Sequence, residues 1–378
     1  MRASADVVVV GAGVVGAACA YFAARAGLQV AVVDRGPVAG GTTSAGEGNL
    51  LISDKAPGPD LDLMRHSLSL WRSLDLGDVE LEPKGGLVVA STSAGFDGLR
   101  ASVSAHRDAG VEAVPVSASE LSAYEPELAA GLAGGAFYPE DMQVQPMLAA
   151  AHLLRSSSAA FHPGVAVTAI ERDGAGRVAA VRTTRGRITT PAVVNAAGTW
   201  SGEVSALAGA ELPIRPRRGF ILVTEPLPPV VRHKVYSADY MATVASDSGD
   251  LQVSAVVEGT RSGTVLIGSS RERVGFDRTF SLPVLRRLAA QAIALFPFLA
   301  RVRAIRAYRG FRPYSPDHLP VIGADPRVPG LVHACGHEGA GIGLAPATGD
   351  LVAAVLTGAV PAVDLAPFAP ARFAEVTS

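Results

Sequence analysis

Three glycines near the amino terminus form the pattern with the clearest chemical use. Gly11, Gly13 and Gly16 follow an apolar run at 6–10 and open an alanine-rich stretch that we expect to be helical, with Gly27 as its cap. In such a turn the first glycine permits a sharp bend, the second lets a pyrophosphate approach the backbone, and the third allows close packing of strand and helix. The start of the helix adds free N–H groups and a positive dipole. The turn therefore predicts a dinucleotide site.

An acidic residue completes this βαβ unit. Residues 29–33 form a second apolar run, and Asp34 stands at its end, where a carboxylate can accept the ribose hydroxyls of a dinucleotide. Arg35 follows Asp34 and is compatible with a 2′-phosphate, but it is equally compatible with a solvent-exposed position. The unit alone leaves the choice of dinucleotide open.

The next segment favours FAD over NAD. Residues 40–50 read GGTTSAGEGNL, and their small and hydroxyl-bearing side chains suit a loop that lies against further phosphate and flavin atoms. An ordinary surface loop is the alternative interpretation. The chain carries a single GxGxxG turn, which argues against a flavin reductase that also binds a nicotinamide nucleotide.

Two stretches near the carboxyl end also have the composition of a site. Residues 308–323 read YRGFRPYSPDHLPVIG, and residues 336–349 read GHEGAGIGLAPATG. We expect the second stretch to lead from a strand at 332–336 through a glycine-rich turn into a helix at 345–357. Such a turn can direct backbone N–H groups and a helix dipole at the flavin edge where negative charge develops on reduction.

These motifs together resemble the FAD-dependent D-amino-acid oxidase superfamily, in the branch with glycine and sarcosine oxidases. Within it the chain is most similar to the flavin subunits of proline, hydroxyproline and opine dehydrogenases. The resemblance rests on GAGVVG with Asp34, on the loop at 40–50, on NAAGTW at 195–200, on RPRRGF at 215–220 and on the two carboxyl-terminal stretches. It spans the chain from end to end.

The resemblance implies a non-covalently bound FAD. It places the ADP half on the glycine turn and Asp34, phosphates or ribityl on the hydroxyl-bearing residues of the loop at 40–50, and the flavin pyrimidine edge on the second glycine-rich turn. The cofactor residues that we expect are Gly11, Gly13, Val14, Val15, Gly16, Asp34, Arg35, Thr42, Thr43, Ser44, Gly48, Asn49, Leu50, Val165, Ala197, Gly198, Trp200, Arg312, Gly339, Ala340, Gly341, Ile342 and Gly343. For Trp200 simple packing is the alternative.

The resemblance also implies a carboxylate clamp. In relatives the arginine of an (L/F)RP triplet holds the substrate carboxylate, and this triplet contains Arg312. A guanidinium fork matches a carboxylate in geometry, which an ammonium group cannot do. Glycine oxidases carry a second arginine where this chain has Gly339, so the rest of substrate recognition passes to other residues. Neither Cys19 nor Cys335 aligns with a position of covalent flavin attachment.

Other residues are candidates for substrate contact. Glu47 can bind an ammonium group, although a solvated loop carboxylate is the simpler interpretation. His337 can polarise or position the substrate, or it can be a structural histidine. Glu338, Tyr240 and Tyr314 can also line the pocket, and packing is the alternative for both tyrosines. We name no catalytic base.

The chemistry implied is dehydrogenation of a C–N bond in a small amino, imino or N-substituted amino acid of the proline, hydroxyproline, sarcosine or opine type. Hydride leaves for flavin N5 and an imine remains. A hydroxy-acid or glycerol-phosphate dehydrogenase is one alternative, and a non-catalytic subunit that holds FAD is another. Relatives of the opine and hydroxyproline type work beside a larger electron-transfer subunit. This chain has no clustered cysteines that could hold an iron–sulfur centre, so its electrons could leave through such a partner subunit.

The same patterns predict an α/β plus α+β fold of two domains. We expect a Rossmann-type FAD domain from residues 1–80, 146–215 and 305–378, with an inserted antiparallel-sheet substrate domain from 81–145 and 216–304. Periodicity predicts further helices at 60–75, 97–109, 147–157 and 283–299. Strands are expected at 165–170, 178–184 and 192–195.

Composition excludes several classes of protein. The chain has 378 residues, a net charge of -2 and 48% hydrophobic residues, which indicates a globular protein with no basic field for nucleic acid. Two isolated cysteines disfavour iron–sulfur and structural zinc sites, and we expect no metal. We find neither a signal peptide nor an apolar run long enough to span a membrane, so a cytoplasmic location is expected.

Overall fold

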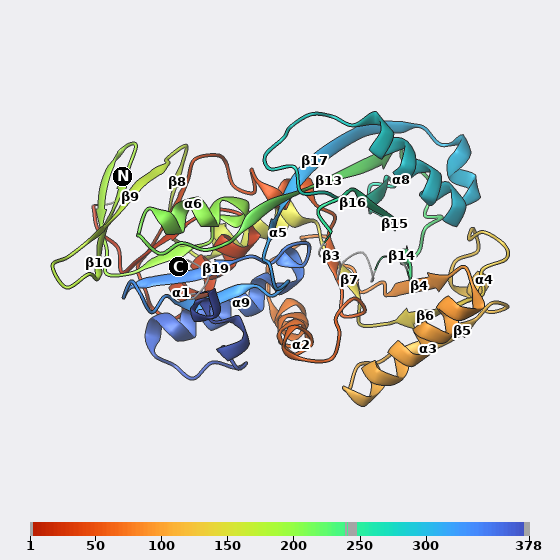
Figure 1. Ribbon diagram of the computed structural model, residues 1–378, viewed down its shortest axis with the longest axis horizontal. Helices are drawn as coiled ribbons and strands as arrows, with labels where there is room; N and C mark the ends of the chain where they lie inside the picture. The colour runs from red at the N-terminus through yellow and green to blue at the C-terminus, as the bar shows by residue number, and fades with distance from the viewer. Residues whose placement is uncertain (1–2, 239, 241–247, 374–378) are drawn as a thin grey trace.

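Two large sheets organise the chain (Figure 1). The computed structural model describes residues 3–238, 240 and 248–373. In Figure 1 the six-stranded sheet and its helices occupy one half of the molecule, and the eight-stranded sheet occupies the other. No helix within these described residues is long and apolar enough to cross a membrane.

The six-stranded sheet is parallel except for one edge strand. Its order is β18-β19-β12-β1-β2-β8, and only β18 runs antiparallel to its neighbour. The central strands are short β-branched runs buried on both faces, as parallel sheets require. The strands are β1 Val7–Val10, β2 Val30–Asp34, β8 Ala160–Pro163, β12 Val193–Asn195, β18 Val321–Ala324 and β19 Leu331–Cys335.

The eight-stranded sheet is mostly antiparallel. Its order is β17-β13-β16-β15-β14-β4-β6-β5, with one parallel pair between β14 and β4. The strands are β4 Gly86–Ala90, β5 Val114–Ser117, β6 Gly134–Tyr138, β13 Arg215–Thr224, β14 Lys234–Ser237, β15 Gln252–Gly259, β16 Val265–Arg271 and β17 Ala304–Tyr314. Strand β17 pairs with β13 along its whole length, so this sheet extends to Tyr314, ten residues into the predicted FAD segment that begins at residue 305.

Two smaller sheets complete the strand inventory. A pair, β3 Asn49–Leu50 and β7 Met142–Gln143, lies between the two large sheets in Figure 1. A three-stranded meander covers one end of the six-stranded sheet and consists of β9 Val167–Arg172, β10 Val178–Thr183 and β11 Gly186–Thr189.

Helices cover both sheets. They are α1 Val14–Arg25, α2 Pro59–Ser73, α3 Ser93–Asp108, α4 Leu121–Tyr124, α5 Pro146–Ser156, α6 Ser201–Ala206, α8 Leu282–Leu295 and α9 Gly341–Thr357. Helix α9 packs against both α1 and α2, and a side chain at Gly349 would lie 2.7 Å from the α1 backbone. Gly27 follows α1 with φ +90, as its predicted role as a cap requires.

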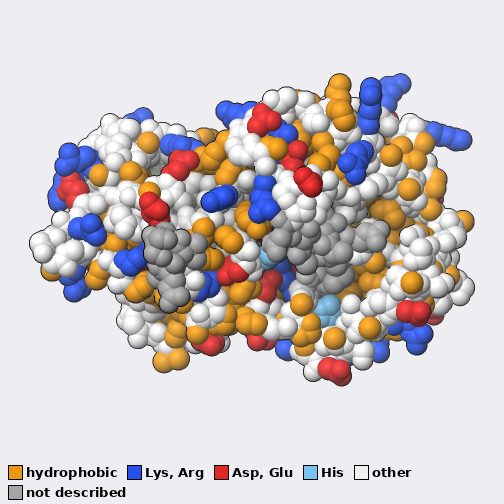
Figure 2. Space-filling model, viewed as in Figure 1, with side chains coloured by type: hydrophobic (Ala, Val, Ile, Leu, Met, Phe, Trp, Pro, Cys, Tyr) orange, Lys and Arg blue, Asp and Glu red, His pale blue; other side chains and the backbone are white. Residues whose placement is uncertain are grey.

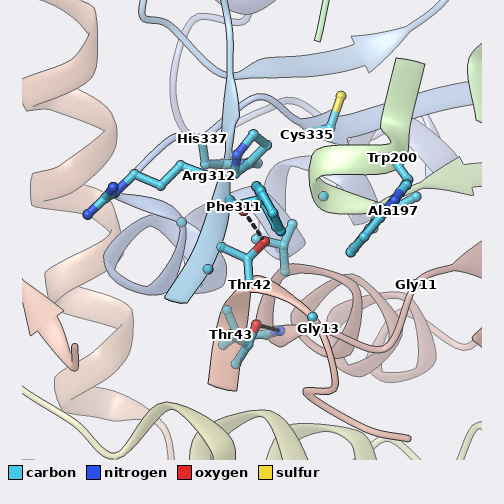
Figure 3. Close-up of a pocket in the computed structure, with 18 of the residues that line it drawn as sticks. Gly11, Gly13, Thr42, Thr43, Ala197, Trp200, Phe311, Arg312, Cys335 and His337 are labelled. Carbon is cyan, nitrogen blue, oxygen red and sulfur yellow. Dashed lines mark hydrogen bonds between the residues drawn. The ribbon is translucent and has the colours of Figure 1, made fainter. Parts of the chain in front are cut away.

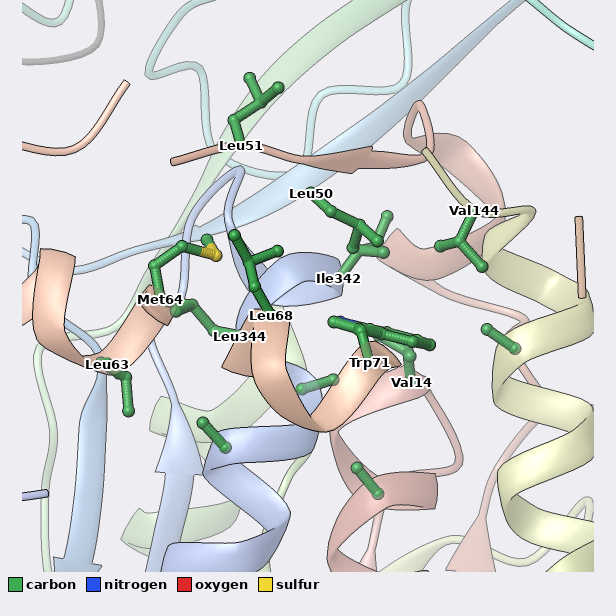
Figure 4. Packing of buried hydrophobic residues seen from close by; sticks show 14 of the residues in the cluster. Val14, Leu50, Leu51, Leu63, Met64, Leu68, Trp71, Val144, Ile342 and Leu344 are labelled. Atoms are coloured by element: carbon green, nitrogen blue, oxygen red, sulfur yellow. The ribbon is translucent and has the colours of Figure 1, made fainter. Parts of the chain in front are cut away.

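The core beside the glycine turn at residues 11–16 is built from four segments of the chain. Figure 4 shows Trp71 and Leu68 of α2 packed with Val14 of α1 and Ile342 of α9. Val144 closes the same cluster from the residues before α5. These buried contacts fix the starts of α1 and α9 relative to each other, which matters because both face the same cavity.

The predicted fold class is confirmed, and most elements lie close to their expected bounds. The helices expected at 283–299 and 345–357 have different bounds in the structure, each for a clear physical reason. Helix α8 ends at Leu295 because Pro297 starts a separate 3-10 helix, and α9 begins at Gly341 because tertiary contacts stabilise a glycine-rich first turn. Strand β8 was not predicted, since its sequence AFHP carries little strand signal.

On the face in Figure 2 acidic and basic side chains are interspersed.

Candidate functional site

One cavity collects most of the predicted site residues. It has a volume of about 460 Å³ and is lined by residues that follow the carboxyl ends of the parallel strands. Gly11 follows β1, Asp34 ends β2, Val165 follows β8, Ala197 follows β12 and His337 follows β19. In a parallel sheet these ends lie on one edge, where ligands bind. The fold therefore brings together motifs that are far apart in the sequence.

Each of the three glycines of the first turn is favoured for a different steric reason. Gly11 has φ +114, and a side chain there would lie 2.3 Å from the carbonyl oxygen of Ala196. At Gly16 a Cβ would lie 2.0 Å from the carbonyl oxygen of Gly11, so the first turn of α1 could not pack on the strand. At Gly13 a Cβ would lie 3.2 Å from the Thr43 hydroxyl. Gly11 and Gly13 line the cavity, and Gly16 supports them from behind.

Asp34 stabilises the turn and also borders the cavity. One carboxylate oxygen accepts the Ala12 N–H at 2.7 Å and the other accepts the Gly36 N–H at 2.7 Å. Each oxygen retains a lone pair for a ligand hydroxyl. The Arg35 guanidinium lies 4.2 Å from the ring centre of Trp200, so it forms a cation–π contact at the cavity wall.

The loop after β2 places two threonines in the cavity wall (Figure 3). Thr42 donates its hydroxyl to the Phe311 carbonyl at 2.7 Å, which ties the loop to β17. Thr43 accepts the Val14 N–H at 3.0 Å, so its own hydroxyl hydrogen is available to a ligand. Ser44 is exposed, bonds to the Gly41 carbonyl and does not line the cavity.

Two helix starts face the cavity, and neither is capped by the side chain of its own N-cap residue. Gly13 is the N-cap residue of α1 and Ala340 is that of α9, and neither helix has a capping hydrogen bond from its N-cap side chain. Uncapped helix starts leave N–H donors and positive dipole ends for an anion or a polarised carbonyl. Gly339, Gly341 and Ile342 border the cavity beside the second helix start. This arrangement, together with the glycine cradle, fits a dinucleotide that extends from one helix to the other.

The first turn of α9 is stabilised by α2. The Gly343 carbonyl accepts hydrogen bonds from Ser67 Oγ at 2.6 Å and from Trp71 Nε1 at 3.0 Å. Ala347 donates its N–H to the same Ser67 Oγ at 3.2 Å, so this hydroxyl bridges the Gly343 carbonyl and the Ala347 N–H. Pro346 has no N–H, so the regular ladder is interrupted here in any case. Gly343 therefore positions the helix start and does not line the cavity.

Arg312 lies on β17 at the far end of the cavity from the first glycine turn. In Figure 3 its side chain extends away from Trp200, and Nη1 donates to the Ser270 carbonyl at 2.8 Å. A Cβ at Gly219 would lie 2.2 Å from Nη1, so this glycine makes room for the guanidinium. Burial, and then the neighbouring Arg271, lower the pKa of Arg312 to about 10. Among the described residues Arg312 forms no salt bridge.

Glu47 borders the same end of the cavity. It is buried, and its Oε1 has no hydrogen-bond partner while Oε2 accepts from Asn49 at 3.3 Å, as far as the described residues extend. Gly268 makes room for the carboxylate, since a Cβ there would lie 2.5 Å from Oε1. Burial raises the pKa of Glu47, against the opposing charge of Lys234. The interpretation of Glu47 as a solvated loop carboxylate does not fit this environment.

Glu338 and Tyr314 have structural partners. Glu338 borders the cavity, yet its carboxylate lies 3.5 Å from Arg217 Nη1 and 3.4 Å from His318 Nδ1. Tyr314 is buried outside the cavity lining, and Arg273 donates to its hydroxyl at 3.2 Å. Tyr240 does line the cavity.

His337 is held by its neighbours in one orientation. Thr348 donates its hydroxyl to the Leu344 carbonyl at 2.8 Å, so it accepts the hydrogen bond from His337 Nε2 at 2.9 Å. Nε2 then carries the proton and Nδ1 keeps a lone pair. Burial, and then the charge of Lys55, lower the pKa of His337 to about 3. The imidazole is therefore neutral, and it positions the turn at 336–341.

This neutral histidine predicts acid sensitivity. A histidine in the unfolded chain gains a proton near pH 6.5, whereas His337 in the folded protein gains one only near its lowered pKa, about 3. The folded state should thus lose about 1.4 kcal/mol of stability per pH unit as pH falls below 6.5. We expect His337→Gln, which can still donate to Thr348, to lose about 2 kcal/mol less than wild type between pH 6.5 and 5 in urea unfolding. If the unfolding free energies of wild type and His337→Gln fell equally with pH, His337 would not be the group that causes the acid sensitivity.

Several predicted cofactor residues do not line the cavity and support it instead. Gly48 accommodates the Val144 carbonyl, from which a Cβ would be 1.8 Å away, and Leu50 is fully buried in the core. The predicted residues outside the lining are Gly16, Ser44, Gly48, Leu50, Ala340, Gly343 and Tyr314. All the others border the cavity.

Sequence motifs also miss several lining residues. Gly219 and Gly310 stand directly opposite each other on β13 and β17, and Ile221 follows on the same strand face. Glycines inside β-branched strands signal a close approach, and this signal is present in the sequence. Helix α6 contributes lining residues that nothing in the sequence marks. The missed residues include Glu203, Val204, Leu207, Gly219, Ile221, Gly310, Phe311 and Cys335.

Comparison with known proteins identifies the fold and the cofactor. Residues 6–355 match the DAO family model, described as FAD dependent oxidoreductase. Hydrogen cyanide synthase subunit HcnC of Pseudomonas aeruginosa is 30% identical over 99% of this chain and 97% of its own. Glycine oxidase of Geobacillus kaustophilus is 31% identical over 97% of each chain. The crystal structure of L-proline dehydrogenase from P. horikoshii aligns with a TM-score of 0.90 at 22% identity, covering 100% of this chain and 99% of that one.

These matches confirm three expectations. The predicted superfamily, the fold class and the use of FAD are all supported. The two uncapped helix starts and the glycine cradle provide a physical basis for holding the cofactor.

We expect the FAD to be held without a covalent bond. Cys335 lines the cavity but is buried, and burial raises the pKa of its thiol to about 12, so it is a poor nucleophile. Cys19 is buried inside α1, away from the cavity lining. Acid precipitation of the purified protein should leave a yellow supernatant and a colourless pellet. A pellet that keeps the flavin absorbance would contradict this expectation.

Proposed function

We propose, from the premise that this chain belongs to the DAO family of FAD-dependent oxidoreductases, that it dehydrogenates the C–N bond of a small amino, imino or N-substituted amino acid. FAD, when bound, supplies the two-electron acceptor. The chain's own residues bind and orient the substrate and keep water out. One observation carries the proposal: a partly buried Arg312 borders the cavity and forms no salt bridge among the described residues.

Arg312 and Glu47 suit the two ends of an α-amino acid. The Arg312 fork would hold the carboxylate by two parallel hydrogen bonds. Glu47 Oε1, which is buried without a partner in the described structure, would accept a hydrogen bond from the substrate nitrogen. Hydride leaves a carbon only when its nitrogen can donate a lone pair, so the amine must be neutral at that moment. The raised pKa of Glu47 allows it to take up the amine proton.

The neighbours' names support this class without selecting a member. Glycine oxidase and L-proline dehydrogenase, by their names, act on amino acids. HcnC is named as a subunit, so an electron-accepting partner subunit is compatible with this chain, and we include it in the proposal.

Anaerobic reduction tests the proposal. Proline, hydroxyproline, sarcosine, glycine, aspartate and N-carboxymethyl amino acids are mixed separately with the yellow protein, and the loss of flavin absorbance is followed. At least one amine should bleach the flavin in a saturable manner. If lactate or glycerol phosphate bleaches it and no amine does, the hydroxy-acid alternative is correct. If nothing bleaches it, the chain holds FAD without using it on these substrates.

A further inference from the structure

A second arginine beside the cavity forms no ion pair with any described residue. Arg271 ends β16 and is 3% exposed, and its Nε and Nη1 atoms have no hydrogen-bond partner in the structure that is described. Removing a guanidinium from water is costly unless an anion or several acceptors replace the water. Arg271 is therefore a buried cation whose counterpart is absent from the described residues that surround it.

The location of Arg271 places it next to the substrate end. Its guanidinium lies 4.7 Å from the ring centre of Tyr240, and Tyr240 lines the cavity. The carbonyl of Ser270, the residue before it, accepts the hydrogen bond from Arg312 at 2.8 Å. The charge of Arg271 also contributes to the lowered pKa of Arg312, so the two guanidinium groups are electrostatic neighbours. Arg271 itself lies outside the cavity lining, so the two cations flank one end of the cavity, with Arg312 in its wall and Arg271 next to the lining residue Tyr240.

The nearby carboxylates already have cationic partners. Glu338 lies 3.5 Å from Arg217, and Glu258 lies 3.2 Å from Lys234. Glu272 pairs with Arg218 at 2.8 Å. Among described residues only Glu47 remains at this end, and Lys234, Arg312 and Arg271 all act electrostatically on it. One carboxylate shared among three cations leaves Arg271 undercompensated when a single substrate carboxylate binds Arg312.

We propose that Arg271 is a second carboxylate site and that the substrate is an amino acid with two carboxylates, one held by Arg312 and the other by Arg271. This inference rests on the proposed function, which it narrows to a substrate class. N-carboxyalkyl amino acids and amino dicarboxylic acids share this chemistry. Gly339 leaves the space beside Arg312 free of a side chain, since a Cβ there would lie 3.7 Å from Arg312 Nε. The second positive charge comes instead from the antiparallel sheet.

Binding of non-reacting acids tests the site without turnover. The holoenzyme is titrated with succinate and glutarate, and with propionate and butyrate as matched monocarboxylates, while the flavin spectrum is monitored. Wild type should bind the better diacid at least about tenfold more tightly than either monoacid. In Arg271→Met the diacid should bind roughly 30-fold more weakly, because a charge-assisted pair is lost, while monoacid binding changes less than about threefold.

Two further variants separate the specific loss of the Arg271 guanidinium fork from a general loss of positive charge. Arg271→Lys keeps the charge but loses the fork, so it should retain only part of the diacid preference. Arg306→Met removes an exposed charge from the same sheet and should bind both classes as wild type does. Equal binding of diacids and monoacids by wild type overturns the proposal, as does an equal loss of both in Arg271→Met. If Arg271→Met does not fold, the wild-type comparison and Arg271→Lys still decide.

Reduction assays then separate the second site from the amine function itself. Aspartate, glutamate and N-carboxymethylalanine are compared with sarcosine and proline in anaerobic bleaching. Faster reduction by a dicarboxylate supports the second site and shows which of its two sources the enzyme uses. If monocarboxylates alone reduce the flavin, the second site is refuted and the amine function stands. If no amine reduces it, the proposed function fails, and the titration with non-reacting acids still decides the binding site.

Discussion

Replacing Arg312 by methionine should give a folded, yellow protein whose kcat/KM for its amino acid substrate falls by about 2–5 kcal/mol in transition-state binding, roughly 30-fold to several thousand-fold. The physical reason is the loss of a partly buried guanidinium fork, which in the proposed function holds the substrate carboxylate. Methionine keeps much of the side-chain volume, so packing against Gly219 should survive. The measurement is anaerobic reduction of the flavin over a range of substrate concentrations.

The control for this variant is Arg306→Met. Arg306 is exposed on the same strand, and its guanidinium lies 5.9 Å from the ring centre of Tyr308, so its removal changes the net charge equally without touching the cavity lining. We expect its kcat/KM to stay within about threefold of wild type, as for a surface substitution. An unchanged kcat/KM in Arg312→Met would remove the clamp from the proposal. Loss of FAD in that variant would show that Arg312 supports the cofactor instead.

Gly16→Ala should destabilise the protein by about 3 kcal/mol or more and weaken FAD binding strongly. The added Cβ would lie 2.0 Å from the Gly11 carbonyl oxygen and 2.9 Å from the Gly11 carbonyl carbon. Both are backbone atoms, so the strand, the turn or α1 must move as a unit. Any such shift displaces the N–H groups at the start of α1. Thermal unfolding and FAD titration of the apoprotein measure the two effects.

Gly98→Ala is a matched control for that substitution. Gly98 lies inside α3, and a Cβ there would meet nothing within 4 Å. The same change should therefore stabilise the helix by about 0.5–1 kcal/mol, because alanine has the higher helix propensity. FAD binding should be unaltered. Two helical glycines with opposite responses would separate the steric effect at the turn from the general effect of alanine. Similar responses would contradict the packing explanation.

Local residue patterns predicted FAD as the cofactor, and they placed the glycine turn and Asp34 at one cavity. The glycine turn and Asp34 work through contacts within one βαβ unit, such as the hydrogen bonds from Ala12 and Gly36 to the Asp34 carboxylate. Glycine is required there because of φ angles and backbone clearances, which a short sequence motif records. Gly48 and Leu50, which were predicted as cofactor residues, lie outside the cavity lining. A linear motif does not distinguish a lining residue from its support.

Other parts of the site depend on contacts between distant segments. Ser67 and Trp71 carry no motif, yet they position the start of α9 beside the cavity through the Gly343 carbonyl, about 270 residues away in the chain. Nothing in the sequence marks Arg271, because one arginine among many has no signature of its own.

The amino-acid sequence by itself determined the dinucleotide turn, the FAD family and the carboxylate-clamp candidate, because short motifs encode local backbone geometry and a fixed chemical role. Only the tertiary structure decided which charges are left uncompensated. Burial and pairing of Glu47, Arg271 and Arg312 depend on side chains from β13, β15, β16 and β17 that meet across the sheet. Electrostatic balance is a property of neighbours in space, so it is established only when the chain has folded.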